Sequence, residues 1–141
     1  ETGGSSDIEI SAALVQELID EQTAKGISHD RIILAGFSQG GVIALQLGLR
    51  LDKRIAGIVA LSTYLHDAIK TEEQRHDANL ALPILMVHGT MDPMISIMRA
   101  ATSRENLIRL GYDVQWKDYP MGHQVCLEEL GDISAFLRSC L

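Results

Sequence analysis

The six residues Gly36-Phe37-Ser38-Gln39-Gly40-Gly41 follow a short apolar run at residues 31–36 and precede a helical pattern at residues 40–51. The run contains β-branched residues and does not alternate, which predicts a strand buried on both faces. The six residues contain the pattern G-x-S-x-G, and a nucleophilic serine in this pattern needs a strand before it and a helix after it. Ser38 is therefore a candidate nucleophile, and a chance glycine-rich turn is the alternative.

The chemistry of this turn suits a reactive hydroxyl. A serine between strand and helix is held in strained backbone that lifts its side chain above the edge of the sheet. We expect Gly36 and Gly40 to be the positions where a side chain would collide with neighbouring backbone. The helix that starts near Gln39 aims its N–H groups at the site, and these groups favour developing negative charge.

Outward from this turn, helices and strands alternate along one domain of residues 1–141. Helices are expected at residues 8–25, 40–51, 96–110 and 126–141, strands at 31–36, 55–61, 83–88 and 114–119, and a long connection at 62–82. This alternation predicts an α/β fold, with a parallel sheet of about four strands flanked by helices on both faces. In such sheets ligands bind beyond the carboxyl ends of the strands.

Two features of the first segment carry further expectations. Residues 1–6 are polar and rich in glycine and serine, which is typical of a frayed end. In the first helix Ile10, Leu14 and Leu18 recur every four residues, so we expect this stripe to face the core.

An acid follows the third predicted strand. The segment HGTMDP at residues 88–93 places Asp92 a few residues past the strand end, where a carboxylate can orient an imidazole. Pro93 holds Asp92 in extended backbone. Taken alone, Asp92 would be interpreted rather as a loop residue or as a cap of the helix at residues 96–110. His88 ends a buried strand, and we interpret it as a structural, hydrogen-bonded histidine.

A histidine follows the fourth predicted strand. His123 lies in the loop segment YPMGHQV at residues 119–125, from which it could act as a general base; alone, it would be an ordinary exposed loop histidine. The chain order Ser38, Asp92, His123 is the order that this kind of hydrolase requires. A metal site at His88, Asp92 and His123 is disfavoured, because their spacing matches no compact ligand motif and Ser38 would be left unexplained.

Composition excludes some partners. The formal net charge of −7 argues against nucleic-acid binding and against attraction to anionic membranes. No apolar run is long enough to be an integral membrane segment. Cys126 and Cys140 fall in one predicted helix about four turns apart, so they cannot pair. Free thiols favour a reducing compartment, and we expect a cytoplasmic protein.

The segments GFSQGG, HGTMDPMIS and YPMGHQV resemble the carboxylesterase/acyl-protein thioesterase (phospholipase/carboxylesterase) family of α/β-hydrolases, in a bacterial type. The resemblance implies that Ser38 is the nucleophile, His123 the base and Asp92 its orienting acid, with the backbone amide of Gln39 in the oxyanion hole. It also implies substrates that are small acyl esters or thioesters, and neither a metal nor an organic cofactor.

The residues 61–65 look like the family's stretch beside the acyl site. Candidates for the wall that binds the acyl chain are Phe37, Tyr64, Met91, Met94 and Met121, and ordinary packing is an equal alternative for each of them.

The chain departs from the family at its N-terminal end. The family fold has further strands before the serine strand, and a loop there, usually with a His-Gly pair, supplies a second oxyanion amide. Nothing before Ile8 can do so, which suggests an N-terminally truncated, C-terminal part of the fold. Three explanations of this departure compete. The chain is a fragment of a longer enzyme, or a short form that completes its sheet as a homodimer through the exposed edge at residues 31–36, or a reduced hydrolase that works alone.

The function expected from these observations is hydrolysis of carboxylic esters or thioesters through an acyl-serine intermediate. A catalytically weak or inactive binding module with an incomplete oxyanion hole is the main alternative. Transfer of the acyl group to an acceptor other than water is a third.

Overall fold

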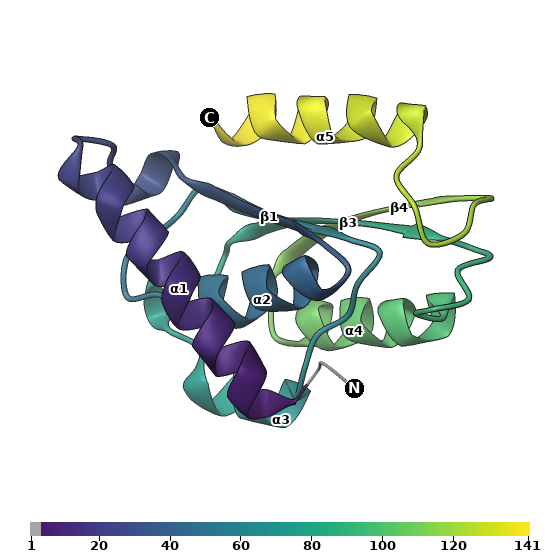
Figure 1. Ribbon diagram of the computed structural model, residues 1–141, viewed down its shortest axis with the longest axis horizontal. Helices are drawn as coiled ribbons and strands as arrows, with labels where there is room; N and C mark the ends of the chain where they lie inside the picture. The colour runs from purple at the N-terminus through teal and green to yellow at the C-terminus, as the bar shows by residue number, and fades with distance from the viewer. Residues whose placement is uncertain (1–3) are drawn as a thin grey trace.

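The computed structural model describes residues 4–141, and its centre is a four-stranded parallel sheet (Figure 1). The strands, in chain order and in spatial order alike, are β1 (Ile33–Phe37), β2 (Gly57–Leu61), β3 (Pro83–Gly89) and β4 (Asp113–Tyr119). Parallel neighbours need a crossover between them, and the intervening helices supply it. The predicted α/β class and the strand number are confirmed.

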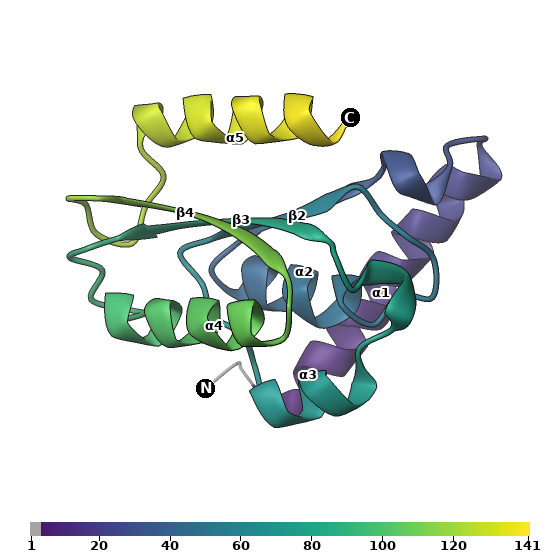
Figure 2. The same cartoon turned by 180° about the vertical axis from the view of Figure 1, so that it is seen from behind.

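Helices cover both faces of this sheet, as the sequence predicted. They are α1 (Ser5–Ala24), α2 (Gln39–Gly48), α3 (Ala68–Gln74), α4 (Ile97–Arg109) and α5 (Leu127–Cys140), with short 3-10 helices at His29–Arg31 and Asp77–Asn79. Figures 1 and 2 show α2 and α4 on one face and α5 on the opposite face. The α1 helix packs mainly against α2.

The two central strands divide their side chains between the two faces. On the face of α2 and α4, one core cluster contains Ile58, Ala60, Ile84 and Met86. On the face of α5, a second cluster contains Val59, Leu61, Leu85, Val87 and Phe136. Because both faces are covered, these strands are apolar throughout and show no alternation in the sequence.

The first strand is less buried than its sequence suggested. Leu34 is buried, but Ala35 and Phe37 are exposed, so the expectation of burial on both faces is wrong for β1. The reason is its position, because β1 is an edge strand that pairs only with β2 among the described residues. The edge position itself agrees with the open edge expected at residues 31–36.

The first helix turns a different face to the core than predicted. Its stripe of Ile10, Leu14 and Leu18 is 61%, 58% and 57% exposed. The buried residues of α1 are Ile8, Ala12 and Ile19. The helix is apolar on two sides, and the second side packs on α2. The predicted core stripe is therefore a solvent-facing stripe in this structure.

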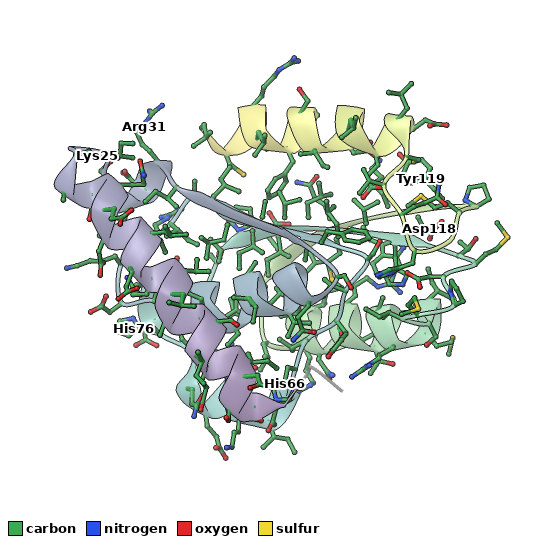
Figure 3. All side chains as sticks on the ribbon, viewed as in Figure 1. Lys25, Arg31, His66, His76, Asp118 and Tyr119 are labelled. Carbon is green, nitrogen blue, oxygen red and sulfur yellow. The ribbon has the colours of Figure 1, made fainter. Side chains whose placement is uncertain are left out.

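The helix α1 also begins earlier than the expected start at Ile8. Ser5 and Ser6 belong to it, although residues 1–6 were expected to be a frayed end; residues 1–3 lie outside the described residues. The Ser5 hydroxyl lies 2.8 Å from Nε2 of His66, and Figure 3 shows His66 beside the start of this helix. This contact joins the first turn of α1 to the loop before α3.

Candidate active site

Ser38 occupies the turn between β1 and α2, in strained backbone. Its φ of 57° and ψ of −120° are rarely adopted by residues other than glycine. Two hydrogen bonds fix the turn: the Ser38 N–H donates to the Leu61 carbonyl at 2.8 Å, and the Thr63 hydroxyl donates to the Ser38 carbonyl at 2.7 Å. The end of β2 therefore holds the serine turn in place.

The tight turn depends on two glycines, of which the sequence predicted one. A Cβ on Gly36 would lie 2.1 Å from the carbonyl oxygen of Gly40, so any side chain there must displace the turn. A Cβ on Gly41 would lie 2.5 Å from a side-chain carbon of Thr63. A Cβ on Gly40 would meet nothing within 4 Å, so the expected collision at Gly40 is wrong. The second close approach is that of Gly41 to Thr63.

Ser38, His123 and Asp92 form one chain of hydrogen bonds. Nε2 of His123 lies 2.9 Å from Oγ of Ser38, and Nδ1 of His123 lies 2.7 Å from Oδ2 of Asp92. A carboxylate oxygen only accepts, so Nδ1 carries the hydrogen and Nε2 accepts from the Ser38 hydroxyl. The structure thus brings together the three residues singled out from the sequence, each following a different strand.

The environment of Asp92 favours its ionised form. Its side chain is completely buried, which raises the pKa of this carboxyl. Hydrogen bonds from the Ile95 N–H, from His123 and from the Met94 N–H outweigh that effect, so the pKa of Asp92 lies below its ordinary value. Oδ1 accepts from the Met94 and Ile95 N–H groups at 2.8 and 2.9 Å, which leaves Oδ2 for His123.

The loop that carries His123 is pressed against the end of β3. A Cβ on Gly89 would lie 2.3 Å from the Met121 carbonyl oxygen and 2.4 Å from that of Gly122. The Met91 N–H also donates to the Met121 carbonyl at 3.1 Å. Sequence reasoning missed Gly89, and its only signal was a glycine directly after a buried strand.

The far end of the same loop is tied to α5. The Glu129 side chain accepts from the Cys126 N–H at 3.2 Å and is fully buried. Tyr119, at the end of β4, donates its hydroxyl to Asp132, and this bond raises the pKa of Tyr119 to about 12. Figure 3 shows Tyr119 near the start of α5. These contacts fix both ends of the segment that carries His123.

The five candidate acyl-wall residues have different surroundings. The Phe37 ring is 39% exposed, and its centroid lies 4.8 Å from that of the His123 ring, so this side chain lies at the site. Met121 is buried in the histidine loop, whereas Met91 and Met94, beside Asp92 in the chain, are 63% and 73% exposed. Tyr64 is buried in the core cluster beside α1 and α2.

Packing contacts surround the ring of Tyr64. The Arg99 guanidinium lies 3.5 Å from the centre of its ring, and the ring packs with Ile43 and Ile95. These contacts explain its burial by ordinary packing, the alternative left open for it.

Gln39 is the first residue of α2, and Ser38 is its N-cap. The first N–H groups of a helix point out of its end and carry partial positive charge. The amide of Gln39 thus belongs to the turn from which the Ser38 hydroxyl projects.

Three further observations concern the described part of the chain. Within residues 4–141, no three His, Cys, Asp or Glu side chains are grouped so that they could hold a metal ion. In the same residues every helix is too short or too polar to cross a bilayer. Cys126 and Cys140 are both free, so the expectation that they do not pair is confirmed.

A parallel sheet with a serine on a strained strand-to-helix turn, and with an acid and a histidine after two later strands, defines the α/β-hydrolase class. Within that class, the family model described as Phospholipase/Carboxylesterase matches residues 3–141, so this chain belongs to that family. The family resemblance of the three sequence motifs is thereby confirmed.

The chain is similar to two fungal proteins named acyl-protein thioesterase 1. It is 41% identical to that of Gibberella zeae, covering 95% of this chain and 58% of the relative, and 42% identical to that of Neurospora crassa, covering 93% and 55%. The chain thus spans little more than half the length of these relatives. Because they are fungal, the expectation of a bacterial type is not supported.

Solved structures show the same fold. Arabidopsis thaliana SOBER1 has a TM-score of 0.90 at 26% identity, over 96% of this chain and 65% of that one. The esterase PE8 has a TM-score of 0.88 at 29% identity, over 96% of this chain and 63% of that one. In both comparisons this chain matches about two thirds of a longer chain.

Proposed function

We propose that this chain carries the catalytic triad of a serine hydrolase that cleaves carboxylic esters or thioesters of acyl chains. The observation that carries the proposal is the continuous hydrogen-bonded chain from Ser38 through His123 to Asp92, at 2.9 and 2.7 Å. The family membership and the names of the fungal relatives support the same reaction class.

In the proposed mechanism, Nε2 of His123 takes the proton of the Ser38 hydroxyl while its oxygen attacks the acyl carbonyl. The tetrahedral intermediate collapses when His123 returns the proton to the leaving alcohol or thiol, and an acyl-serine remains. Water then repeats both steps and releases the acid. The ionised Asp92 holds the imidazole in the required tautomer and stabilises the imidazolium that forms.

The negative charge on the tetrahedral oxygen needs preorganised donors. We assign one donor, the backbone amide of Gln39, which is reinforced by the N-terminal end of α2. A hole that lacks one of two donors loses about 2.7 to 4 kcal/mol of transition-state stabilisation. The alternative function is a module that binds acyl groups without cleaving them, and it applies if Gln39 is the sole donor.

The proposed substrates are small acyl esters or acyl thioesters. Phe37 beside His123, and the exposed Met91 and Met94 near Asp92, offer apolar surface to an acyl chain. We further propose that the protein works in the cytoplasm, since Cys126 and Cys140 are free thiols.

We also propose that the open edge of β1 pairs with a strand of a second copy of this chain. The edge strand exposes Ala35, and the exposed stripe of Ile10, Leu14 and Leu18 adds apolar surface on the same domain. Unpaired backbone groups and apolar side chains together favour association. Light scattering after gel filtration tests this proposal, and a monomer at every concentration would contradict it.

The decisive experiment for the function is labelling by a fluorophosphonate probe, combined with hydrolysis of a short p-nitrophenyl ester. Ser38→Ala should lose both activities while keeping its thermal unfolding midpoint. Ser28→Ala is the matched control, because this serine is exposed and its hydroxyl donates to Asp30, before β1 and outside the triad. Equal hydrolysis by Ser38→Ala and wild type would exclude the mechanism. Labelling without hydrolysis would indicate a reactive serine in an incomplete oxyanion hole.

A further inference from the structure

A second histidine lies directly behind the acid of the triad. His88 comes from the end of β3 and is 1% exposed. Its Nε2 lies 2.8 Å from the carbonyl oxygen of Ile95 and 3.6 Å from Oδ2 of Asp92. The sequence indicated a structural histidine at this position, and the burial and the hydrogen bond agree with that interpretation.

The hydrogen-bond partner of His88 determines that its Nε2 carries a hydrogen. A carbonyl oxygen only accepts, so Nε2 carries a hydrogen and donates it to Ile95. The N–H of the same residue, Ile95, donates to Oδ1 of Asp92 at 2.9 Å. A single buried residue thus takes a hydrogen bond from His88 on one side and gives one to Asp92 on the other.

These contacts continue into the triad. The strand β3 carries His88, and the bond from His88 to Ile95 holds the turn of residues 92–95. That turn fixes Oδ1 of Asp92. With Oδ1 fixed, Oδ2 has a single direction, which is toward Nδ1 of His123. Nε2 of His88 also lies 3.6 Å from Oδ2 of Asp92, so the imidazole borders both the turn and the carboxylate that the turn carries.

We propose that His88 is a positioning residue that aims Asp92 at His123 through the main chain of Ile95. The proposal rests on the function proposed above, because positioning matters for rate only if Ser38 is the nucleophile. Without the imidazole donor, the buried carbonyl of Ile95 has to find another partner, and the turn that carries Asp92 has to move. A buried histidine that served only to fill space would not influence the bond between Asp92 and His123.

The test compares two replacements at this position. His88→Met keeps the bulk of the side chain and removes the donor. His88→Gln places an amide nitrogen where Nε2 stands and so retains the donor. The matched control is Ser103→Ala, because Ser103 is also buried and satisfies a backbone group, the Leu65 N–H at 2.8 Å, away from the triad.

Two readouts are required, and one of them is independent of catalysis. The first is the downfield proton resonance of the hydrogen held between His123 and Asp92. The second is the rate at which a fluorophosphonate labels Ser38. In His88→Met we expect the resonance to move upfield or disappear and labelling to slow by about tenfold to a hundredfold, as for a displacement near 1 Å. His88→Gln should keep the resonance and label within about threefold of wild type, since its donor remains.

The outcomes separate this inference from the proposed function. A folded His88→Met with unchanged resonance and unchanged labelling overturns the positioning role, as does an equal loss in Ser103→Ala. If His88→Met does not fold, His88→Asn decides, because its shorter amide cannot reach Ile95; an unchanged resonance in that variant overturns the role. If wild type is not labelled but its resonance depends on His88, the proposed function fails while the positioning role stands.

Discussion

Exchanging Asp92 for asparagine replaces one carboxylate oxygen by an NH₂ group and leaves the volume unchanged. The structure determines which way the amide must lie. Oδ1 accepts two backbone N–H groups, from Met94 at 2.8 Å and from Ile95 at 2.9 Å, so the amide oxygen has to keep that position. The NH₂ group then takes the place of Oδ2, 2.7 Å from Nδ1 of His123.

Two donors would then face each other, and His123 can avoid this only by losing the hydrogen on Nδ1. The single N–H hydrogen of the neutral imidazole then lies on Nε2. This nitrogen is 2.9 Å from the Ser38 hydroxyl and can no longer accept its proton. The same exchange in a Ser-His-Asp triad on another fold lowers kcat about 10⁴-fold, because the wrong tautomer is stabilised. At about 1.36 kcal/mol per decade, this loss corresponds to about 5.4 kcal/mol of transition-state stabilisation.

The assay is the fluorophosphonate labelling rate of Ser38 at pH 7, with ester hydrolysis in parallel. The matched control is Asp67→Asn, since Asp67 caps α3 by accepting from the Lys70 N–H at 3.0 Å and asparagine caps equally well. A labelling rate of Asp92→Asn above about one tenth of the wild-type rate would refute the tautomer argument. A variant that no longer unfolds cooperatively would have to be compared at a lower temperature, where both proteins are folded.

Gly36→Ala should lower the free energy of unfolding by about 3 kcal/mol, because its Cβ would lie 2.1 Å from the Gly40 carbonyl oxygen. Urea unfolding measures this loss. The control is Gly4→Ala, where a Cβ meets open space, and an equal loss in both variants would contradict the prediction. Glu129→Gln should be more stable than wild type at pH 8 but not at pH 4. Burial raises the pKa of Glu129, the Cys126 N–H opposes this and Asp132 adds to it, so the folded state holds the proton more tightly than the unfolded state. Wild-type stability therefore falls as pH rises from the ordinary value of 4.5 through the raised pKa. An equal difference between the two thermal midpoints at pH 4 and pH 8 would show that Glu129 has no such effect.

Much of the site could be predicted from the sequence because its signals are local. The motif at residues 36–41, Asp92 and His123 each follow an apolar run, and parallel strands bring their carboxyl ends to the same edge of the sheet. The order of elements was predicted for the same reason, since helix and strand periods differ. Their bounds agree with the structure within a few residues. The helix at Ala68–Gln74 lies in the stretch expected to be a long connection with a turn or two of helix.

What the sequence could not provide depends on contacts between distant segments. The face that α1 turns inward could not be chosen, because Ile8 and Ile10 both lie on apolar stripes and only the packing against α2 distinguishes them. The close approach of Gly41 to Thr63, and that of Gly89 to the histidine loop, involve residues far apart in the chain. No periodicity or motif reports such distances.

The pairing of β3 with β4 has a consequence for how this molecule could vary. Gly89 is the register partner of Tyr119, and the acid loop and the histidine loop leave the sheet from this one rung of the ladder. A slip of one residue between the two strands would displace the loops relative to each other by about 3.3 Å, more than the whole length of the bond between Asp92 and His123. The register between β3 and β4 therefore determines whether Asp92 and His123 lie within hydrogen-bonding distance of each other. Insertions or deletions that preserve function should accumulate between residues 72 and 78, which are largely exposed and lie outside both loops. They should be absent from the two short loops that start at this pair of residues.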